Sequence, residues 1–456
     1  MDVKDHHLFR VLMFPWLAHG HIFPFLELAK ELHKRNFYIY FCSTPINLSF
    51  INEHLNDNEF PSIQLVELHL PSLPNLPPSK HTTKSLPPHL MPTLKAAFDM
   101  AEQSFSQILT TLHPDVLIYD FLQPWASTIA SILNIPAIHF LTTGAFTAGY
   151  MYQLCKKNGP NAGLPILPIL LEEHEDEKAF QKLSSTSHGL SDKERFLRSI
   201  DQSMNLFLIK TFGEIEEKYI NSLSLITGKT VIPVGPLVHE PPTDDKHTSS
   251  FINWLDKKDK SSTVLVSCGS ESYLSREEIE EMAYGLELSE VNFIWVIRFP
   301  DQGEQISLSE VLPKEFMGRI GERGMVVEGW APQVDILKHS SIGGFVSHCG
   351  WSSVMEGLKL GVPIIAMPMQ LDQPLNAKLV VEMGVGLEVN RNSSGSRKFA
   401  REEVANVIRE VIMGKEGENH VKQKVTKISE KMREQGDEDI DDLVEMLLHL
   451  SGKIKA

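Results

Sequence analysis

The feature that most constrains the fold is an alternation of short apolar runs with amphipathic helical patterns, which occurs in two separate series along the chain. The first series contains the β-forming runs RVLMFPW, FYIYFCSTP, DVLIYD and AIHFLTT. The second contains STVLVSCGS, NFIWVIRFP, IGGFVSHCG and PIIAMPM. Parallel strands need long crossover connections, which are usually helices, so this alternation is typical of parallel sheets with helices on both faces. The sequence therefore predicts an α/β protein with two doubly wound, Rossmann-like domains that face each other across a cleft.

The two series also set the expected domain boundaries. A chain of 456 residues is longer than one hydrophobic core usually supports, which favours two domains. We expect an N-terminal domain at 1–238, a linker at 239–250 and a second domain at 251–436. The last segment, 437–456, has a helical pattern with one apolar face and is expected to dock back on the N-terminal domain. The proline-rich tract 71–88 is interpreted as a surface loop rather than core.

Composition excludes several classes of partner. The formal net charge is -16 and no long basic run occurs, so nucleic acid is not an expected partner. No segment approaches the roughly 20 apolar residues of a membrane span, and the N-terminus lacks the pattern of a signal peptide. The 4 cysteines are widely spaced and form no CxxC pair, which favours reduced thiols and a cytoplasmic location over a disulfide or zinc framework.

Ligands of open parallel sheets bind at the carboxyl ends of the strands, so the loops that follow the strands are candidate sites. One of them is the stretch VSHCGWSSVMEG, in which a strand is followed by a helix that begins near Ser352. The first N–H groups of such a helix, the hydroxyls of Ser352 and Ser353, and His348 would suit a phosphate or diphosphate. A serine-capped turn without a ligand is an equally open interpretation of these residues. No GxGxxG or GxxxxGK[ST] motif occurs in the first loop of either series, which argues against a dehydrogenase or a P-loop NTPase.

The segment from Trp330 to Gln373 carries a family resemblance. It reads WAPQVDILKHSSIGGFVSHCGWSSVMEGLKLGVPIIAMPMQLDQ and resembles the nucleotide-sugar signature of plant family 1 UDP-dependent glycosyltransferases, which have the GT-B fold. The likeness extends to FPWLAHGHIFPFLELAKEL, LIYDFLQPWA, VIPVGPL and VSCGSES, and it fades over 164–198 and in the C-terminal helices. Within the family, PFLELAKEL, FCSTPINL, HTTKSLPPHLMPTL and LIYDFLQPWA are most similar to the branch-forming enzymes, which add a sugar to a sugar already carried by a small molecule.

The resemblance implies a UDP-sugar site in the second domain. Uracil would stack on Trp330 and pair with the backbone of Ala331. Glu356 would accept hydrogen bonds from both ribose hydroxyls, with Gln333 nearby. The diphosphate is assigned to His348, Ser352, Ser353 and Ser270, and the transferred sugar to Trp351, Asp372 and Gln373. The carboxylate of Asp372 and the amide of Gln373 would accept from sugar hydroxyls, and Gln at this position is usually associated with glucose.

One residue of the signature departs from the family pattern. The position after Trp351 is normally Asn, and here it is Ser352. A serine hydroxyl can still donate to a phosphate oxygen but reaches less far. We therefore expect a lower donor affinity or a bridging water at this position.

The chemistry of transfer predicts a base in the first domain. A hydroxyl becomes a good nucleophile when its proton is removed in the transition state, and the GHxxP element of the family places the base at His21. Asp120 matches the family's carboxylate partner, which would stabilise the imidazolium. His19 and Phe121 are expected to line the acceptor pocket, and Thr142 or its neighbour Thr143 to touch the donor sugar or phosphate. The arrangement implies direct displacement with inversion at the anomeric carbon.

No metal and no cofactor are expected beyond UDP-glucose as co-substrate. The DxD spacings fall in the acidic run DEDIDD at the start of the last helix, where acidic residues are favoured by the helix dipole. The charge of the diphosphate would be met by the helix N-terminus and His348 instead.

Three functions stay open from the sequence. The leading one is transfer of glucose from UDP-glucose to a sugar hydroxyl of a plant glycoside by a monomeric enzyme. The second is the same chemistry on an aglycone hydroxyl, and the third is a non-catalytic UDP-sugar binder. A hydrolase is not expected because no GxSxG element occurs.

Overall fold

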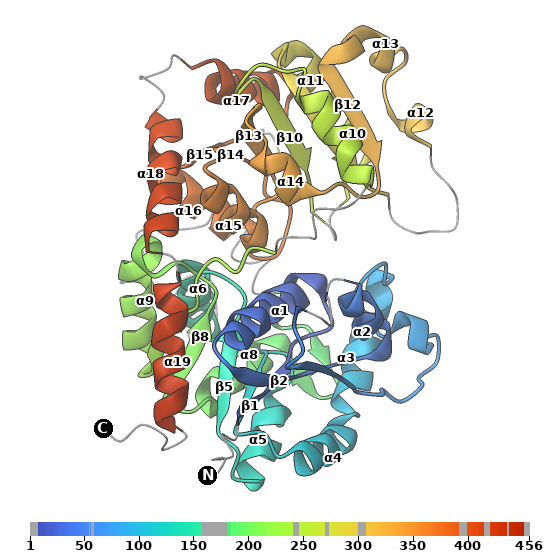
Figure 1. Ribbon diagram of the computed structural model, residues 1–456. Helices are drawn as coiled ribbons and strands as arrows, with labels where there is room; N and C mark the ends of the chain where they lie inside the picture. The colour runs from blue at the N-terminus through green and yellow to red at the C-terminus, as the bar shows by residue number, and fades with distance from the viewer. Residues whose placement is uncertain are drawn as a thin grey trace. The chain divides into compact units, whose positions relative to one another are not determined.

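The chain forms two compact units, which we describe from a computed structural model (Figure 1). The structure describes residues 8–53, 55, 59–156, 181, 183–239, 246–269, 273–299, 307–391, 399–414, 420–435 and 437–450. Unit 1 comprises Met1–His239 together with Asp437–Ala456, and unit 2 comprises Glu240–Gly436. The boundary between them falls inside the predicted linker. The first helix of unit 2, α10 (Lys246–Leu255), begins before the predicted end of that linker.

Unit 1 is built on a parallel sheet with the strand order β3-β2-β1-β4-β5-β8-β9. The chain runs outward from β1 in one direction and then from β4 in the other, so the switch point of the topology lies between β1 and β4. The strands are β1 (Phe9–Phe14), β2 (Phe37–Ser43), β3 (Ile63–Glu67), β4 (Val116–Tyr119), β5 (Ala137–Leu141), β8 (Leu206–Ile209) and β9 (Thr230–Pro233). Ligands of doubly wound sheets bind where the strand order reverses, at the carboxyl ends of the strands.

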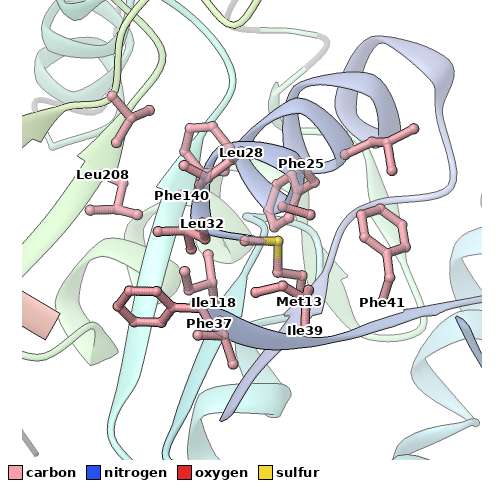
Figure 2. Packing of buried hydrophobic residues seen from close by; sticks show 14 of the residues in the cluster. Met13, Phe25, Leu28, Leu32, Phe37, Ile39, Phe41, Ile118, Phe140 and Leu208 are labelled. Atoms are coloured by element: carbon pink, nitrogen blue, oxygen red, sulfur yellow. The ribbon is translucent and has the colours of Figure 1, made fainter. Parts of the chain in front are cut away.

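Helices cover both faces of this sheet because the side chains of each strand alternate between the faces. In β1, Val11 and Met13 pack under α1 (His19–Lys34), whereas Leu12 and Phe14 face the opposite side. Figure 2 shows the first of these clusters, in which Phe25, Leu28 and Leu32 of α1 lie over apolar residues of the strands. The other helices are α2 (Pro45–Asn52), α3 (Met91–Asp99), α4 (Glu102–Leu112), α5 (Pro124–Ile132), α6 (Ala145–Lys156), α8 (Asp192–Gln202) and α9 (Gly213–Thr227), and a short hairpin joins β6 (Thr186–Ser187) to β7 (Leu190–Ser191).

The C-terminal helix α19 (Glu438–Leu450) is part of unit 1, although it comes after the segment Glu240–Gly436, which forms unit 2. Its buried residues Ile440, Leu443 and Leu447 join the same apolar cluster as α1. Polar contacts hold its first turn, since Arg35 Nε donates to Asp441 Oδ1 at 2.6 Å and the Gly213 N–H donates to Asp439. The acidic run at the start of this helix therefore makes contacts within unit 1.

The tract 71–88 is mostly exposed or partly exposed, as predicted for a surface loop, but it also contains buried residues and short 3-10 helices. It contains the short 3-10 helix η1 (Pro78–Lys80), and a second one, η2 (Pro88–Leu90), begins at its end. Several of its side chains are buried, among them Leu76 and Thr83. The Thr83 N–H donates to the carbonyl of Leu17, and Thr44 Oγ1 donates to that of His81. These contacts satisfy backbone groups that would otherwise need water, so a tract rich in turn residues can pack against the loop that precedes α1.

Unit 2 has a parallel sheet in the order β12-β11-β10-β13-β14-β15, with its switch point between β10 and β13. Its strands are β10 (Thr263–Ser267), β11 (Asn292–Ile297), β12 (Gly324–Glu328), β13 (Ile342–Ser347), β14 (Ile364–Ala366) and β15 (Gly386–Glu388). One face is covered by α11 and α17 and the other by α10 and α14. The helices are α11 (Arg276–Ser289), α12 (Leu308–Val311), α13 (Phe316–Ile320), α14 (Gln333–Lys338), α15 (Trp351–Leu360), α16 (Gln373–Glu382), α17 (Arg401–Met413) and α18 (His420–Glu434), with the 3-10 helix η3 (Gly321–Arg323) before β12. In the part of the chain that the structure describes, no helix is long and apolar enough to span a membrane.

Candidate functional site

The predicted base and its carboxylate partner lie together at the switch point of unit 1. His21 is in the first turn of α1, which follows β1, and Asp120 directly follows β4. The His21 Nδ1 atom lies 2.8 Å from Asp120 Oδ2. Asp120 is fully buried, whereas the His21 side chain is 24% exposed. A hydrogen bond from Nδ1–H to the carboxylate selects the tautomer in which Nε2 carries the lone pair that can accept a proton.

The environment of Asp120 keeps its carboxylate ionised. Burial by itself would raise the pKa of Asp120, but the charge of His21 and hydrogen bonds from His21 and the backbone outweigh it and lower the pKa below its ordinary value. The N–H of Trp16 donates to Asp120 Oδ2 at 3.0 Å, and the N–H of Phe121 donates to Oδ1 at 2.7 Å. An ionised and fixed carboxylate both orients the imidazole and stabilises its protonated form.

Thr142 also lies against the predicted base. It follows β5, and its Oγ1 atom is 3.1 Å from His21 Nδ1. The segment that carries Thr142 leads into α6, whose first N–H groups, those of Ala145 and Phe146, donate to the carboxylate of Glu216 at 2.9 and 2.8 Å. Glu216 is fully buried, lies at a kink in α9 and also accepts from the Thr211 hydroxyl. Glu216 was not selected as a candidate from the sequence, because nothing in the pattern EIEEK indicates that one of its carboxylates is buried.

The two residues predicted to line the acceptor pocket make aromatic contacts in unit 1. The ring of Phe121 lies 5.8 Å from that of His21 between centroids. The ring of His19 stacks on Phe50 of α2 at a centroid distance of 4.5 Å. Both side chains are therefore near the start of α1, and their contact with an acceptor stays a prediction.

In unit 2, the structure brings together three residues of the predicted uridine and diphosphate site. The Gln333 side-chain amide, at the start of α14, donates to Ser353 Oγ at 3.1 Å and to Glu356 Oε2 at 2.6 Å. Trp330 is 56% exposed, and Ala331 beside it is buried. The exposed indole of Trp330 and the backbone of Ala331 can bind a nucleobase, and the carboxylate of Glu356, which Gln333 orients, can bind the attached ribose.

His348 follows β13 and is held between two glycines. A Cβ atom at Gly269 or at Gly350 would lie 2.5 Å from its ring. Burial and the nearby positive charge of Arg298 lower the pKa of His348 to about 4. Its Nδ1 atom is buried and has no hydrogen-bond partner among the described residues. The imidazole is thus neutral at neutral pH. If it binds the diphosphate, as predicted, it does so as an N–H donor and not through the charge that the sequence led us to expect.

The residues predicted to face the transferred sugar have structural contacts of their own. Gln373 Oε1 accepts from the backbone N–H groups of Met369 and Gln370, at 2.9 and 2.8 Å. An amide oxygen has two lone pairs, so this geometry changes the prediction that Gln373 accepts from a sugar hydroxyl, and it leaves the NH₂ group as the donor for a ligand. Asn376, which the sequence analysis missed, donates to Asp372 Oδ2 and to the carbonyl of Cys349, both at 3.0 Å.

The other predicted residues stay predictions. Trp351 is buried at the start of α15, Ser352 follows it, and Ser270 lies outside the described residues. Across the described residues, no group of three or more His, Cys, Asp or Glu side chains could hold a metal ion.

The protein has two doubly wound units. Unit 1 carries a histidine–carboxylate pair at its switch point, and unit 2 brings together Gln333, Ser353 and Glu356 of the signature segment. Together these features define a glycosyltransferase of the GT-B class. The family model "Glycosyltransferase, N-terminal domain" matches residues 8–239, and the model "UDP-glucoronosyl and UDP-glucosyl transferase" matches residues 238–444. The chain belongs to the plant family 1 UDP-dependent glycosyltransferases, as the signature predicted. It is therefore an enzyme of the UDP-glycosyltransferase type.

Similar proteins agree with this assignment. Mogroside IIIx synthase of Siraitia grosvenorii is 52% identical over 454 residues, which cover 97% of this chain and 98% of that protein. Beta-D-glucosyl crocetin beta-1,6-glucosyltransferase of Gardenia jasminoides is 47% identical over 444 residues, 96% of this chain and 98% of that protein. The crystal structure of a Glycyrrhiza uralensis glycosyltransferase, complexed with glycyrrhetinic acid 3-O-monoglucuronide, superposes with a TM-score of 0.83 at 24% identity, over 98% of this chain and 97% of that one. This last likeness concerns the fold.

Proposed function

We propose that the protein transfers glucose from UDP-glucose to a sugar hydroxyl of a small-molecule glycoside and so forms a β-linked disaccharide. The observation that carries the proposal is the His21–Asp120 pair at 2.8 Å, which has the geometry of a general base with its stabilising carboxylate. The name of the Gardenia relative states that it glucosylates an already glucosylated compound, which supports a sugar hydroxyl as the acceptor. The preference for glucose rests on the family resemblance at Gln373.

The proposed reaction is a direct displacement. As the acceptor hydroxyl approaches the anomeric carbon, His21 Nε2 takes its proton, and the new bond from oxygen to carbon forms while the bond from that carbon to the UDP oxygen breaks. The imidazolium is stabilised by Asp120, and UDP leaves with the electron pair of the broken bond. Attack from the side opposite to UDP inverts the α-linked donor to a β-glycoside.

The test is a transfer assay with the purified protein. UDP-glucose is offered with flavonoid, terpenoid and lignan aglycones and with their monoglucosides, in the presence of EDTA, and products are identified by mass and their linkage by NMR. UDP-rhamnose, UDP-glucuronic acid and UDP-xylose are tested as rival donors. We expect a second hexose on the monoglucosides alone, and its loss in His21→Ala. Hexose on aglycones would favour the second candidate function, and tight UDP binding without transfer to any acceptor would favour a non-catalytic binder.

We further propose a cytoplasmic monomer that needs no metal. The cysteines Cys42, Cys155, Cys268 and Cys349 are all free, which supports a reducing compartment. Localisation of a fluorescent fusion in plant cells, light scattering of the purified protein, and activity in EDTA test these three statements. Secretion, a stable dimer, or activity that returns only with added metal would contradict the respective part of the proposal.

A further inference from the structure

Arg298 lies at the carboxyl edge of the unit 2 sheet, close to His348. It directly follows β11, which pairs with β10 in parallel, so it is at the same end of the sheet as Gly269 after β10. Together with Cys268, Gly269, Leu274 and neighbouring residues of β11 it lines a small hollow. Its positive charge acts on His348 and contributes to the low pKa of that imidazole. The guanidinium of Arg298 is therefore near His348 and Gly269, although no sequence motif indicated this arginine.

This arginine has no partner for its charge in the part of the chain that the structure describes. The Nε atom is buried without a hydrogen-bond partner, and the guanidinium makes no hydrogen bond or ion pair with the described residues. Burial lowers its pKa, and the Tyr273 hydroxyl partly offsets this. Two other arginines of the same unit are paired with carboxylates, Arg319 with Glu287 at 2.6 Å and Arg401 with Glu281. A partly buried cation that has no counter-charge among the described residues is costly, which favours binding of an anion.

A cation would suit the predicted donor site. A UDP-sugar carries a diphosphate, and the N-terminus of α15 contributes only a partial positive charge. His348 is neutral at neutral pH and donates a hydrogen bond without a full charge. A guanidinium is always charged and binds phosphate oxygens through several N–H groups.

We propose that Arg298, which shares the hollow beside Gly269, binds the diphosphate of the UDP-sugar through its guanidinium. This inference rests on UDP-sugar binding in unit 2 as stated in the proposed function. It does not depend on which acceptor the enzyme uses. Arg298 is then a donor-binding residue, and the adjacent Gly269, which allows close approach to His348, keeps that edge of the sheet open to the ligand.

The test compares UDP with uridine, which lacks the phosphates, in binding titrations without an acceptor. Arg298→Met should weaken UDP binding about 10- to 30-fold and change uridine binding less than about 2-fold, because charge-assisted hydrogen bonds to phosphate are lost. Arg298→Lys should restore part of the UDP affinity. UDP binding to the native enzyme should also weaken with added salt more steeply than in Arg298→Met.

Arg409→Met is the matched control, since Arg409 is a more exposed arginine of the same unit whose guanidinium donates to the Leu288 carbonyl and to Asn406. It should leave both affinities unchanged. Retained uridine binding shows that a variant is folded, and if Arg298→Met does not fold, Arg298→Gln and Arg298→Lys carry the comparison. Equal losses for UDP and uridine, or no loss for UDP, would overturn the inference. Failure of the glycoside transfer assay with an intact difference between UDP and uridine would refute the proposed acceptor and leave the role of Arg298 supported.

Discussion

The two units each place a histidine after a strand at the switch point of a doubly wound sheet, yet the two side chains differ in charge and partners. His21 of unit 1 has its Nδ1 atom 2.8 Å from a buried carboxylate. His348 of unit 2 is held between Gly269 and Gly350 and is influenced by the positive charge of Arg298. The first environment stabilises an imidazolium, and the second keeps the imidazole neutral.

If His21 is the base and His348 binds the diphosphate, as predicted, the same position in the fold serves two kinds of chemistry. A base must accept a proton during the reaction, so a carboxylate beside it is useful. A residue that binds an anion without taking part in proton transfer can stay neutral and donate a hydrogen bond. The environment decides between the two outcomes: Asp120, from another strand, in unit 1, and burial together with the charge of Arg298 in unit 2.

The largest expected effect separates the two histidines by function. His21→Ala should lower kcat about 10²- to 10⁴-fold, because the general base is lost, while UDP affinity changes little. His348→Ala should instead weaken UDP binding about 10-fold through the loss of a hydrogen bond to phosphate. Steady-state kinetics at saturating donor and UDP titrations measure the two effects. An equal loss of kcat in both variants would show that the histidines do not have separate roles.

A second prediction concerns the carboxylate of unit 1. Asp120→Asn should lower kcat about 10²-fold, since the amide no longer stabilises the imidazolium or selects the tautomer. The native pKa of Asp120 is below its ordinary value, so the stability that it contributes is present above about pH 4 and is lost as the pH falls through the native pKa.

The acid dependence is measured by denaturant unfolding between about pH 5 and pH 2. The free energy of unfolding of Asp120→Asn should fall less steeply with decreasing pH than that of the native protein. Asp437→Asn, at a carboxylate that is 60% exposed, is the control and should keep the native slope. A native slope in Asp120→Asn would argue against the low pKa.

A third prediction concerns the glycine beside His348. Gly269→Ala should weaken UDP binding about 10-fold, because its Cβ would lie 2.5 Å from the imidazole and force the ring to move. Gly235→Ala is a matched control, since Gly235 also has a positive φ (73°, against 78° at Gly269), but a Cβ atom there would meet no other atom within 4 Å. The control should lose about 1–2 kcal/mol of stability through backbone strain and retain native UDP affinity. Similar UDP affinities for the two variants would show that His348 tolerates displacement.

The smallest expected effect concerns Ser352, where the family usually has Asn. Ser352→Asn should strengthen UDP binding about 3-fold, because the longer amide reaches a phosphate oxygen directly rather than through water. Ser352→Ala should weaken it by a similar factor. Titrations with UDP measure both changes, and a weaker affinity in Ser352→Asn would indicate that the turn is shaped for serine.

Most of the fold could be predicted from the sequence, because the alternation of strands and helices is a local pattern. The GT-B class and the family were predicted from that alternation and from the signature, and both are confirmed by the family models and relatives. The tract 71–88 is mostly at the surface, as predicted, but its buried residues were not predicted, because the composition of the tract indicated exposure. These residues are held by Leu17, whose carbonyl accepts from the Thr83 N–H, and by Thr44, whose hydroxyl donates to the carbonyl of His81.

The residues of the candidate site could be predicted from the sequence where short motifs specify their chemistry. His21, Asp120 and Glu356 were selected by motif, and the structure places the first two in contact and holds the third by Gln333. The burial of Glu216 could not be predicted from the sequence, because a carboxylate in a charged helical pattern normally faces water. Its function as a cap for α6 depends on a kink in α9 and on the position of another helix.

The sequence by itself determined that this chain is a two-unit α/β glycosyltransferase, and that His21 and His348 each follow a strand, because periodicity and motifs are properties of neighbouring residues. The tertiary structure decided the charge states of these side chains and which of their donors and acceptors are already used within the protein. It pairs His21 with a residue 99 positions away, keeps His348 neutral, leaves Arg298 without a counter-charge in the described part of the chain, and occupies the amide oxygen of Gln373. Burial and hydrogen bonding depend on residues that are distant in the sequence, and these interactions set whether a side chain is a base, a donor or a cation.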